Sequence, residues 1–375
     1  MNSLPTTWFR LRSWSPDNGI SVFRLILAIA VIHGHSCWFL DKDPEHGHDP
    51  VSWITGRQQS SGYFAVNIFF GLSGFLVTAS WFRCRGVLDY LTRRFLRIYP
   101  AFIAVCLVQQ FLFLPLGVHR WLPIPQLSDL CALAAGILSF GGLGPLFVGV
   151  PPDATLFDGL PSIGQINGSL WTIRYEMLCY LTVPVLAAFR LLTCRWFIIV
   201  AWLACSISYS WFCDYWDWPP MIKASIGPTG YVVRFASFFL GGVVAFFEAG
   251  ALLRFRRLGL VALAGWALLS LVLGDRAPGV SRLISALILP SAVILATYDL
   301  AIAPFGKRIS ADLSYGIYLY GWPIQLIVAD RLTSIGLSAP ILTVLASVAV
   351  LVPSYLSWRY VEAPALKLRP SRQSG

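Results

Sequence analysis

Long apolar stretches separated by short polar connections run along almost the whole chain. The stretches cover residues 20–40, 63–82, 95–116, 128–149, 169–189, 196–213, 231–249, 257–274, 281–298, 310–329 and 338–358. A helix needs about 20 apolar residues to cross the hydrocarbon core of a bilayer, and most of the stretches have that length. The pattern therefore predicts an all-α fold, a polytopic bundle of transmembrane helices that forms a single domain over residues 1–375.

The positions of the basic residues predict which connections face the cytoplasm, because Lys and Arg are enriched in cytoplasmic loops. Basic clusters lie before the first stretch, between the second and third, near 190–195, 254–257 and 307–308, and after the last stretch. The other connections are poor in basic residues or carry carboxylates. We therefore expect both termini in the cytoplasm, with short tails at residues 1–18 and 360–375.

The stretch at 128–149 does not fit an alternating topology, because connections of the outside type flank it on both sides. Its glycines, Gly141, Gly142 and Gly144, together with Pro145, weaken a helix there. Irregular backbone at membrane depth is tolerated where protein or a cavity covers it. We expect about ten crossings and one re-entrant or surface-lying segment at 128–149.

The composition agrees with a membrane protein and puts the net charge in context. Of the 375 residues, 57% are hydrophobic and only 12% are charged. A formal charge of +10 would suggest a nucleic-acid partner for a soluble protein. In this chain the basic residues form short clusters between apolar stretches, which topology and anionic lipid explain. We expect membrane lipid as a partner and no nucleic acid.

The first apolar stretch carries two polar groups, Arg24 and His35, that are costly in a membrane and are rare there unless they have a function. The helical rotation between them is about 1100°, so the two side chains fall within roughly 20° of one face and about 16 Å apart along the axis. His33 falls about 180° from Arg24 and points to the opposite side. His35 is our candidate general base toward a hydroxyl. The alternative is a histidine that only links neighbouring helices.

Glu176 is the second candidate catalytic residue. It enters from the outer side at a depth close to that of His35. A carboxylate at that depth would orient the imidazole and stabilise its charged form, as in other acyl transfers. The alternative is a structural ion pair between Glu176 and Arg174 or Arg234.

A basic cluster at the inner end of the third crossing is the candidate donor site. Arg94 and Arg97 are three positions apart and therefore lie on one helix face. A pair of guanidiniums suits a ligand that carries phosphate. The alternative is an ordinary basic collar that only sets the topology. The sequence has no Walker A motif and no GxGxxG after a strand, so it does not predict a nucleotide site of the soluble type.

Two further patterns suit the walls of a ligand site. Small residues interrupt the second crossing at Gly71, Ser73 and Gly74. They allow close helix packing, which is their commoner use in membranes, and would also leave room for a thin ligand. Tyr315 and Tyr318 share one stripe with Trp322 near the end of the chain. Packing is the default explanation for this stripe, and a wall for a sugar or a pantetheine arm is the alternative.

These motifs, in this order, resemble those of the acyltransferase 3 family of integral membrane acyltransferases, and the similarity covers nearly the whole chain. The segments that are similar to family motifs are Arg24 with His35, Phe69-Phe-Gly-Leu-Ser-Gly74, Arg94-Phe-Leu-Arg97 with Tyr99-Pro100, Leu170-Trp-Thr-Ile-Arg-Tyr-Glu176, Ser314-Tyr-Gly-Ile-Tyr-Leu319 and Val361-Glu-Ala-Pro364. Trp171 and Glu176 stand at the tryptophan and glutamate of the family. The chain departs from the family at Tyr320-Gly-Trp-Pro323, where members often carry a histidine.

The resemblance implies an O-acyltransferase in a bacterial inner membrane, which moves an acetyl group from cytoplasmic acetyl-CoA to a hydroxyl of an exopolysaccharide, O-antigen or lipid-linked sugar at the outer face. It implies His35 as a catalytic residue and places Arg24, Arg94 and Arg97 at the donor or the site. We expect His35 and Glu176 to be catalytic, and Arg24, Arg94, Arg97, Ser73, Tyr315 and Trp171 to contact donor or substrate.

The expected co-substrate is acyl-CoA, the expected acceptor is a glycan or a lipid-linked saccharide, and no metal is expected. Two alternatives remain open at the level of the sequence. One is a transporter or flippase of a sugar-bearing lipid, which would also need intramembrane arginines, a glutamate and aromatic residues. The other is the same type of enzyme with succinyl or another acyl group as the donor.

Overall fold

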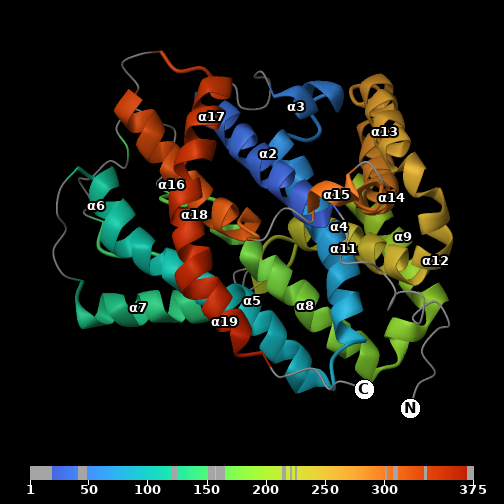
Figure 1. The fold of residues 1–375 in the computed structure, drawn as a ribbon, viewed down its shortest axis with the longest axis horizontal. Coiled ribbons are helices and arrows are strands. Elements are labelled where there is room, and N and C mark those ends of the chain that lie inside the picture. The colour runs from blue at the N-terminus through green and yellow to red at the C-terminus, as the bar shows by residue number, and fades with distance from the viewer. Residues whose placement is uncertain are drawn as a thin grey trace.

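Helices form every regular element of the described residues, and no strand occurs among them. The computed structural model describes residues 19–40, 49–119, 125–150, 157, 165–212, 217–219, 222–223, 226–299, 302–306, 311–332 and 336–369. Seven helices within these ranges are long and apolar enough to cross a membrane. The predicted polytopic helix bundle is confirmed (Figure 1). The number of ten crossings stays a prediction.

The first third of the bundle follows the predicted stretches closely. Its elements are α2 (Ile20–Leu40), α3 (Pro50–Ile54), α4 (Ser61–Trp81), α5 (Val87–Val108), the π-helical turn η1 (Gln109–Phe113), α6 (Leu114–Gly117) and α7 (Leu127–Leu138). The α5 helix begins eight residues before the apolar stretch at 95. The basic cluster of Arg93, Arg94 and Arg97 is therefore part of the helix. The buried carboxylate of Asp49 accepts from the backbone nitrogens of Val51 and Ser61, which joins the start of α3 to the start of α4.

The segment at 128–149, expected to be re-entrant or surface-lying, contains only a short helix. The twelve residues of α7 span about 18 Å, which is less than the roughly 30 Å of a hydrocarbon core. After α7 the chain turns back, so that a Cβ on Gly136 would lie 1.9 Å from the carbonyl oxygen of Pro145. The Gln110 side chain exchanges hydrogen bonds of 2.9 and 3.0 Å with the backbone of Val148. Protein therefore covers this irregular backbone, as expected for such a segment.

The rest of the chain completes the bundle. Its elements are η2 (Leu170–Thr172), α8 (Ile173–Ala188), η3 (Leu191–Thr193), α9 (Arg195–Trp211), α11 (Thr229–Phe247), α12 (Ala249–Leu252), η4 (Leu253–Leu258), α13 (Gly259–Leu273), α14 (Pro278–Thr297), α15 (Ala303–Gly306), α16 (Ser314–Leu332), α17 (Ala339–Ala349), α18 (Leu351–Ser357), η6 (Trp358–Glu362) and α19 (Ala363–Lys367). The tail expected from residue 360 thus starts inside a helical segment that continues to Lys367, and residues 1–18 lie outside the described residues.

Glycines bring the central helices into close contact. A Cβ on Gly74 of α4 would lie 1.9 Å from the carbonyl oxygen of Phe239 on α11, and one on Gly242 of α11 would lie 1.9 Å from the carbonyl oxygen of Gly71. On the other side of α4, a Cβ on Gly34 of α2 would lie 2.5 Å from the backbone nitrogen of Gly62. The small residues of the second crossing therefore serve close packing, which is one of the two uses that the sequence suggests for them.

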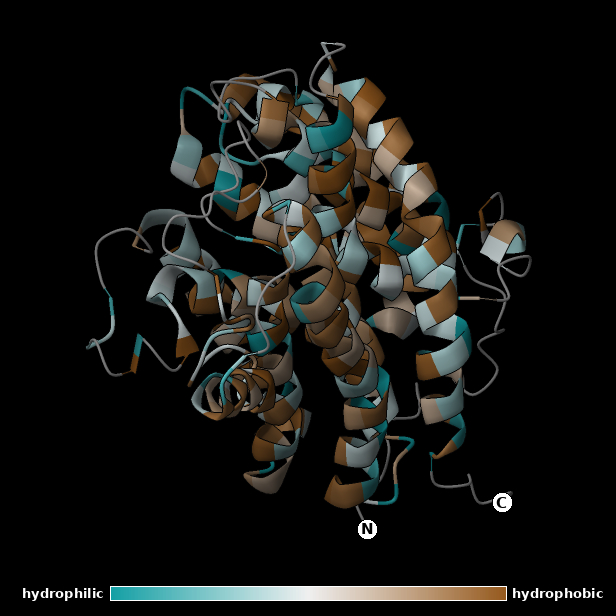
Figure 2. Cartoon of the chain, turned by 90° about the vertical axis from the view of Figure 1, so that its left-hand side faces the viewer, coloured by the Kyte–Doolittle hydropathy of each residue, from teal (hydrophilic) through white to brown (hydrophobic). Residues whose placement is uncertain are grey.

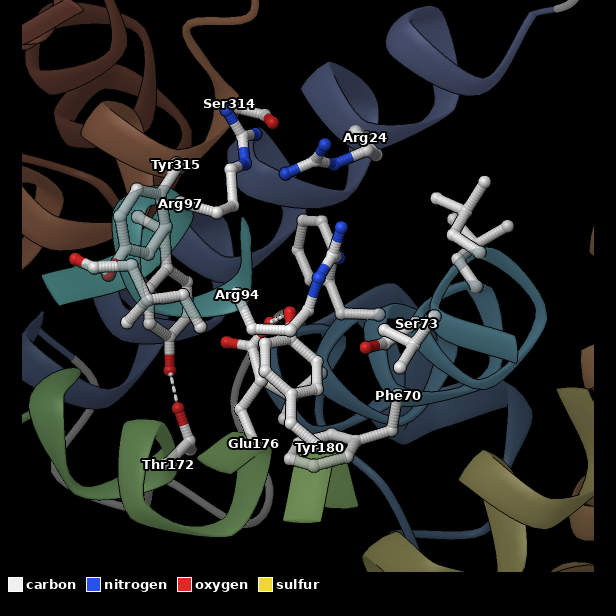
Figure 3. A pocket seen from close by; sticks show the side chains of 17 residues that line it. Arg24, Phe70, Ser73, Arg94, Arg97, Thr172, Glu176, Tyr180, Ser314 and Tyr315 are labelled. Atoms are coloured by element: carbon white, nitrogen blue, oxygen red, sulfur yellow. Dashed lines mark hydrogen bonds between the residues drawn. The ribbon is translucent and has the colours of Figure 1, made fainter. Parts of the chain in front are cut away.

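Apolar side chains also cover the outside of the bundle. Leu268 and Val272 of α13 and Val344 and Val348 of α17 are more than half exposed. Figure 2 shows hydrophobic residues along the outer faces of the long helices. An apolar exterior of this kind is stable in lipid, where water does not contact it. The centre of the bundle, between α2, α4, α5, α8 and α16, is where the polar groups gather (Figures 1 and 3).

Candidate active site

Six of the eight predicted site residues line one cavity of about 130 Å³ (Figure 3). We call this space the arginine cavity. Its lining consists of Arg24, Val66, Phe69, Phe70, Leu72, Ser73, Leu76, Val77, Arg94, Arg97, Ile98, Thr172, Glu176, Tyr180, Ser314, Tyr315 and Tyr318. Five helices and the turn η2 contribute to it, so residues far apart in the sequence meet at one place.

Asp312 holds two of the three arginines at this cavity. Its Oδ2 atom lies 2.6 Å from Nη1 of Arg24 and 2.6 Å from Nη2 of Arg97. On the other side of Arg97, the buried carboxylate of Glu362 lies 3.8 Å from Nη1. The three acidic and basic side chains at Asp312 are each less than one third exposed, so solvent screens these ion pairs only in part.

The sequence reasoning missed Asp312. It stands two residues before the motif that begins at Ser314, at the start of the apolar stretch 310–329 and next to the basic cluster at 307–308. The available signal was a carboxylate inside an apolar stretch, near its cytoplasmic end. Glu362 was noted only as part of the closing Val361-Glu-Ala-Pro364 motif, and the structure gives that motif a contact with Arg97.

Arg94 differs from the other two arginines in its partners. Its Nη2 donates to the Ser80 hydroxyl at 3.1 Å, and its guanidinium lies 5.6 Å from the centre of the Tyr180 ring. Within the described part of the chain no acidic group forms an ion pair with it, and its buried Nε has no hydrogen-bond partner. In Figure 3 the guanidinium of Arg94 extends toward Arg24 and Arg97. Among the described residues, Arg94 is thus the guanidinium of this cavity that forms no ion pair with a carboxylate.

Glu176 also faces the arginine cavity. Its Oε1 accepts a hydrogen bond of 2.5 Å from the hydroxyl of Tyr180, one turn along α8. No hydrogen bond between Glu176 and His35 occurs among the described residues. Arg234, which the sequence offered as a structural partner of Glu176, instead donates to Asn67 at 2.7 Å. Glu176 and His35, predicted to act together, therefore line different cavities.

A second cavity, of about 660 Å³, contains the other two predicted site residues, His35 and Trp171. We call it the histidine cavity. It is lined by Val31, Gly34, His35, Trp38, Ser52, Arg57, Gln58, Ser60, Gly62, Tyr63, Val66, Gln165, Gly168, Ser169, Trp171, Thr172, Tyr231, Tyr318 and Trp322. The rings of Trp171 and Tyr231 lie 4.6 Å apart between centres, and the edge of Trp322 packs on the His35 ring at 4.6 Å. Aromatic side chains therefore form much of the wall around His35.

The two histidines of α2 separate as the helical geometry predicts. His35 faces the histidine cavity, while His33 faces α17, where its Nδ1 is 3.0 Å from the Thr343 hydroxyl. The Nε2 atom of His33 lies 3.6 Å from the sulfur of Cys37. His33 therefore links α2 to α17. It lines neither the arginine cavity nor the histidine cavity.

The two cavities meet at three shared lining residues, Val66, Thr172 and Tyr318. The Tyr318 hydroxyl donates to the carbonyl oxygen of Ser169 at 2.8 Å and hydrogen-bonds to the Thr172 hydroxyl. These bonds tie α16 to η2 at the junction. The arginine cavity and the histidine cavity are thus neighbours, and the hydrogen-bonded Tyr318 is one of the residues between them.

The described residues contain no cluster of three His, Cys, Asp or Glu side chains that could hold a metal ion. The polar groups that line the two cavities are the guanidiniums of four arginines, the carboxyl group of Glu176, an imidazole, hydroxyls and amides. Groups of these kinds bind anions and polar organic molecules through charge-assisted and neutral hydrogen bonds.

Comparisons with known proteins identify the family of the chain. The sequence model of a family described as an acyltransferase domain matches residues 17–359. An O-acetyl transferase of Shigella phage Sf6 is 29% identical over 351 residues, which is 92% of this chain and 95% of that protein. Nodulation protein 10 of Rhizobium leguminosarum bv. viciae is 28% identical over 368 residues, 94% of each chain. No solved structure matches the chain at a significant level.

Proposed function

The chain belongs to this acyltransferase family, and on that premise we propose that it moves an acetyl group from acetyl-CoA on the cytoplasmic side to a hydroxyl of a cell-surface glycan or lipid-linked sugar on the outer side of a bacterial inner membrane. Membership in the family and the helical bundle already make it a multi-pass membrane acyltransferase. The donor, the acceptor, the direction and the roles of individual residues are the content of the proposal.

One observation carries the proposal: the cavity with the unpaired guanidinium and the cavity with the imidazole share Val66, Thr172 and Tyr318. In the proposal, a group that enters the arginine cavity from one side passes the junction formed by these three residues to reach His35. Transfer across a membrane within one bundle requires a connection of this kind, because the donor and the acceptor approach from opposite faces.

The size of the arginine cavity supports entry of a thin ligand end. Its volume of about 130 Å³ is well below the roughly 300 Å³ at which pockets begin to enclose a whole drug-sized molecule. In the proposal the nucleotide part of acetyl-CoA stays at the cytoplasmic mouth, where Arg94 attracts its phosphates. Only the extended pantetheine arm with the thioester enters the bundle, along Ser73 and Tyr315.

His35 is the general base of the proposed reaction. Its imidazole takes the proton of the acceptor hydroxyl, and the hydroxyl oxygen forms a bond to the thioester carbonyl carbon. The carbon–sulfur bond then breaks, and the imidazolium returns the proton to the leaving thiolate, so that free CoA and an acetyl ester result. The aromatic wall that includes Trp171 and Tyr231 suits the apolar face of a sugar ring.

We assign Glu176 to the donor side of the reaction. Its hydrogen bond to Tyr180 and its position opposite the arginines support a role in fixing the arginine cavity. A direct role of Glu176 beside His35 would require a rearrangement of α8. We therefore expect a residue of another helix to orient the imidazole of His35.

A transfer assay tests the proposed function. The purified protein is incubated with labelled acetyl-CoA and with cell-surface glycan from a strain that lacks the protein. We expect free CoA and an acetylated glycan to form in equal amounts, whereas a transporter or flippase releases no CoA. Succinyl-CoA in parallel reveals which acyl group is preferred, and mass spectrometry identifies the acylated sugar position.

Variants of the two neighbouring histidines assign the base in the same assay. His35→Ala should lower the transfer rate by about a hundredfold or more, because general-base catalysis typically contributes that much. His33→Ala is the matched control: it removes a helix contact but leaves both cavities intact, so its rate should stay close to that of the original protein. Full activity of the His35→Ala protein, correctly inserted, would end this mechanism.

A further inference from the structure

A buried glutamine on α16, Gln325, contacts the same turn of α2 that carries His35. Its side chain is fully buried. The Nε2 atom donates to the carbonyl oxygen of Ile32 at 2.7 Å and to the hydroxyl of Ser36 at 2.8 Å. The Ser36 hydroxyl itself donates to the Ile32 carbonyl at 3.0 Å, so it is an acceptor toward Gln325. Both amide protons of Gln325 are therefore committed to α2.

These bonds fix which way the amide faces. A flipped amide would place Oε1 against the carbonyl oxygen of Ile32, and two acceptors without a proton between them repel. The Oε1 atom of Gln325 must therefore point away from that carbonyl. It is buried, and within the described ranges of the chain it has no hydrogen-bond partner.

The neighbour that can satisfy this oxygen is His35. The Gln325 side chain lies within hydrogen-bonding reach of the His35 imidazole. The Nδ1 atom of His35 is buried as well and, among the described residues, is also without a hydrogen-bond partner. Two neighbouring side chains thus each carry a buried polar atom without a partner: one atom is able to carry a proton, and the other is able only to accept it. A buried polar atom left in that state is costly.

We propose that Gln325 is a positioning residue for His35: its Oε1 accepts the Nδ1 proton, which keeps the neutral imidazole in the tautomer whose Nε2 lone pair faces the histidine cavity. This inference rests on the proposed role of His35 as base. It gives the base the support that Glu176, on the other side of Tyr318, does not supply. The edge of Trp322, 4.6 Å from the His35 ring, holds the ring plane from the same helix.

The amide supports the base without adding a charge. The Nδ1 proton remains bonded to Gln325 when Nε2 takes a proton from the acceptor and when it returns it. A carboxylate in the same place would favour the charged imidazolium and raise the pKa of the base. The other titratable or charged groups at the histidine cavity are Arg57, Tyr63, Tyr231 and Tyr318, and none of these is an acid that is ionised at neutral pH.

Two substitutions of Gln325 in the full-length protein test the inference. Gln325→Met keeps the length of the side chain but removes the acceptor, so the Nδ1 proton of His35 loses its partner. The Ser36 hydroxyl keeps its bond to the Ile32 carbonyl. We expect kcat to fall about tenfold, the scale of one lost hydrogen bond at the base, while KM for acetyl-CoA stays unchanged. Gln325→Glu places a carboxylate at Nδ1, so the acidic limb of the pH profile should move up by about one pH unit.

A matched control and a spectroscopic measurement separate positioning from general damage. Gln109→Met removes another buried glutamine, which lies in η1 and lines neither cavity. Its side chain donates a hydrogen bond to the Leu146 carbonyl. It should leave kcat and the pH profile unchanged. In protein labelled with ¹⁵N-histidine, the signal lost in His35→Ala should show the neutral tautomer protonated at Nδ1. This measurement needs no variant of Gln325 to fold.

The outcomes distinguish this inference from the proposed function. If His35→Ala keeps full activity, the base assignment fails, and the inference fails with it. If His35→Ala is inactive while Gln325→Met keeps the original kcat, or Gln325→Glu leaves the acidic limb in place, only the positioning role is overturned. A His35 signal with the proton on Nε2 would overturn it as well.

Discussion

Arg24 and Arg97 share one carboxylate oxygen, Oδ2 of Asp312, at 2.6 Å from each guanidinium. Two positive charges from α2 and α5 are thus held together by one negative charge that precedes α16. Because this carboxylate and the nearby Glu362 are already paired with the two arginines, their first role is to fix the helices around the arginine cavity. Arg94 forms no ion pair of this kind among the described residues, and in our proposal it binds the donor.

Loss of the Asp312 charge should destabilise the bundle. In Asp312→Asn the two guanidiniums repel each other in a site that is partly shielded from water. Breaking a buried ion pair costs about 3 to 5 kcal/mol, and because these side chains are partly exposed we expect about 2 kcal/mol. Thermal unfolding in detergent measures the effect.

The matched control for Asp312 is Glu248→Gln, which removes the carboxylate that lies 2.6 Å from the exposed Arg195. A surface pair of this kind contributes between about 0 and 1 kcal/mol. Equal shifts in the melting temperature of the two variants would contradict the structural role that we give to Asp312.

Arg94 should contribute to donor binding far more than its neighbour Arg93. Arg94→Ala removes the unpaired guanidinium, and a hydrogen bond to a charged group contributes about 1.5 to 3 kcal/mol. We therefore expect KM for acetyl-CoA to rise by about ten- to a hundredfold. Arg93 lies in the same basic cluster, but its Nε is 2.6 Å from Asp89, one turn away. Arg93→Ala should leave KM within a factor of about two. A similar rise in KM in both variants would mean that the cluster only sets the topology.

Tyr318 should control the connection between the two cavities. Tyr318→Ala removes the side chain at the junction, so water from the histidine cavity reaches the thioester. We expect acetyl-CoA hydrolysis without acceptor to increase several-fold, measured as free CoA in an assay without glycan. Tyr318→Phe keeps the ring and loses only the bonds to Ser169 and Thr172, so it should hydrolyse much less. Unchanged hydrolysis in Tyr318→Ala would mean that another group separates the cavities.

The contact between α4 and α11 should not tolerate a methyl group at Gly74. A Cβ there would lie 1.9 Å from the Phe239 carbonyl oxygen, so the helices must move apart. We expect Gly74→Ala to cost about 2 kcal/mol or more in the free energy of unfolding. Gly265→Ala is the control, because a Cβ on that residue of α13 meets nothing within 4 Å. Its higher helix propensity should stabilise the protein by about 0.5 to 1 kcal/mol.

The sequence by itself determined what depends on local geometry. The apolar stretch at 20–40 and the bounds of α2 coincide, because the length and the hydrophobicity of a helix in lipid are properties of its own residues. The rotation of about 100° per residue was enough to separate His35, at a cavity, from His33, which bonds to Thr343. Spacing along one helix likewise placed Arg94 and Arg97 on one face.

Only the tertiary structure decided which groups meet between helices. Asp312 lies 215 residues from Arg97, and Gln325 lies 289 residues from Ser36, so no local pattern connects them. The depth of a residue in the membrane follows from its position in a helix, but the face that it presents depends on how neighbouring helices are rotated and packed. For that reason Glu176, which we expected to act beside His35, faces the arginines. The support of His35 comes in our proposal from a helix near the other end of the chain.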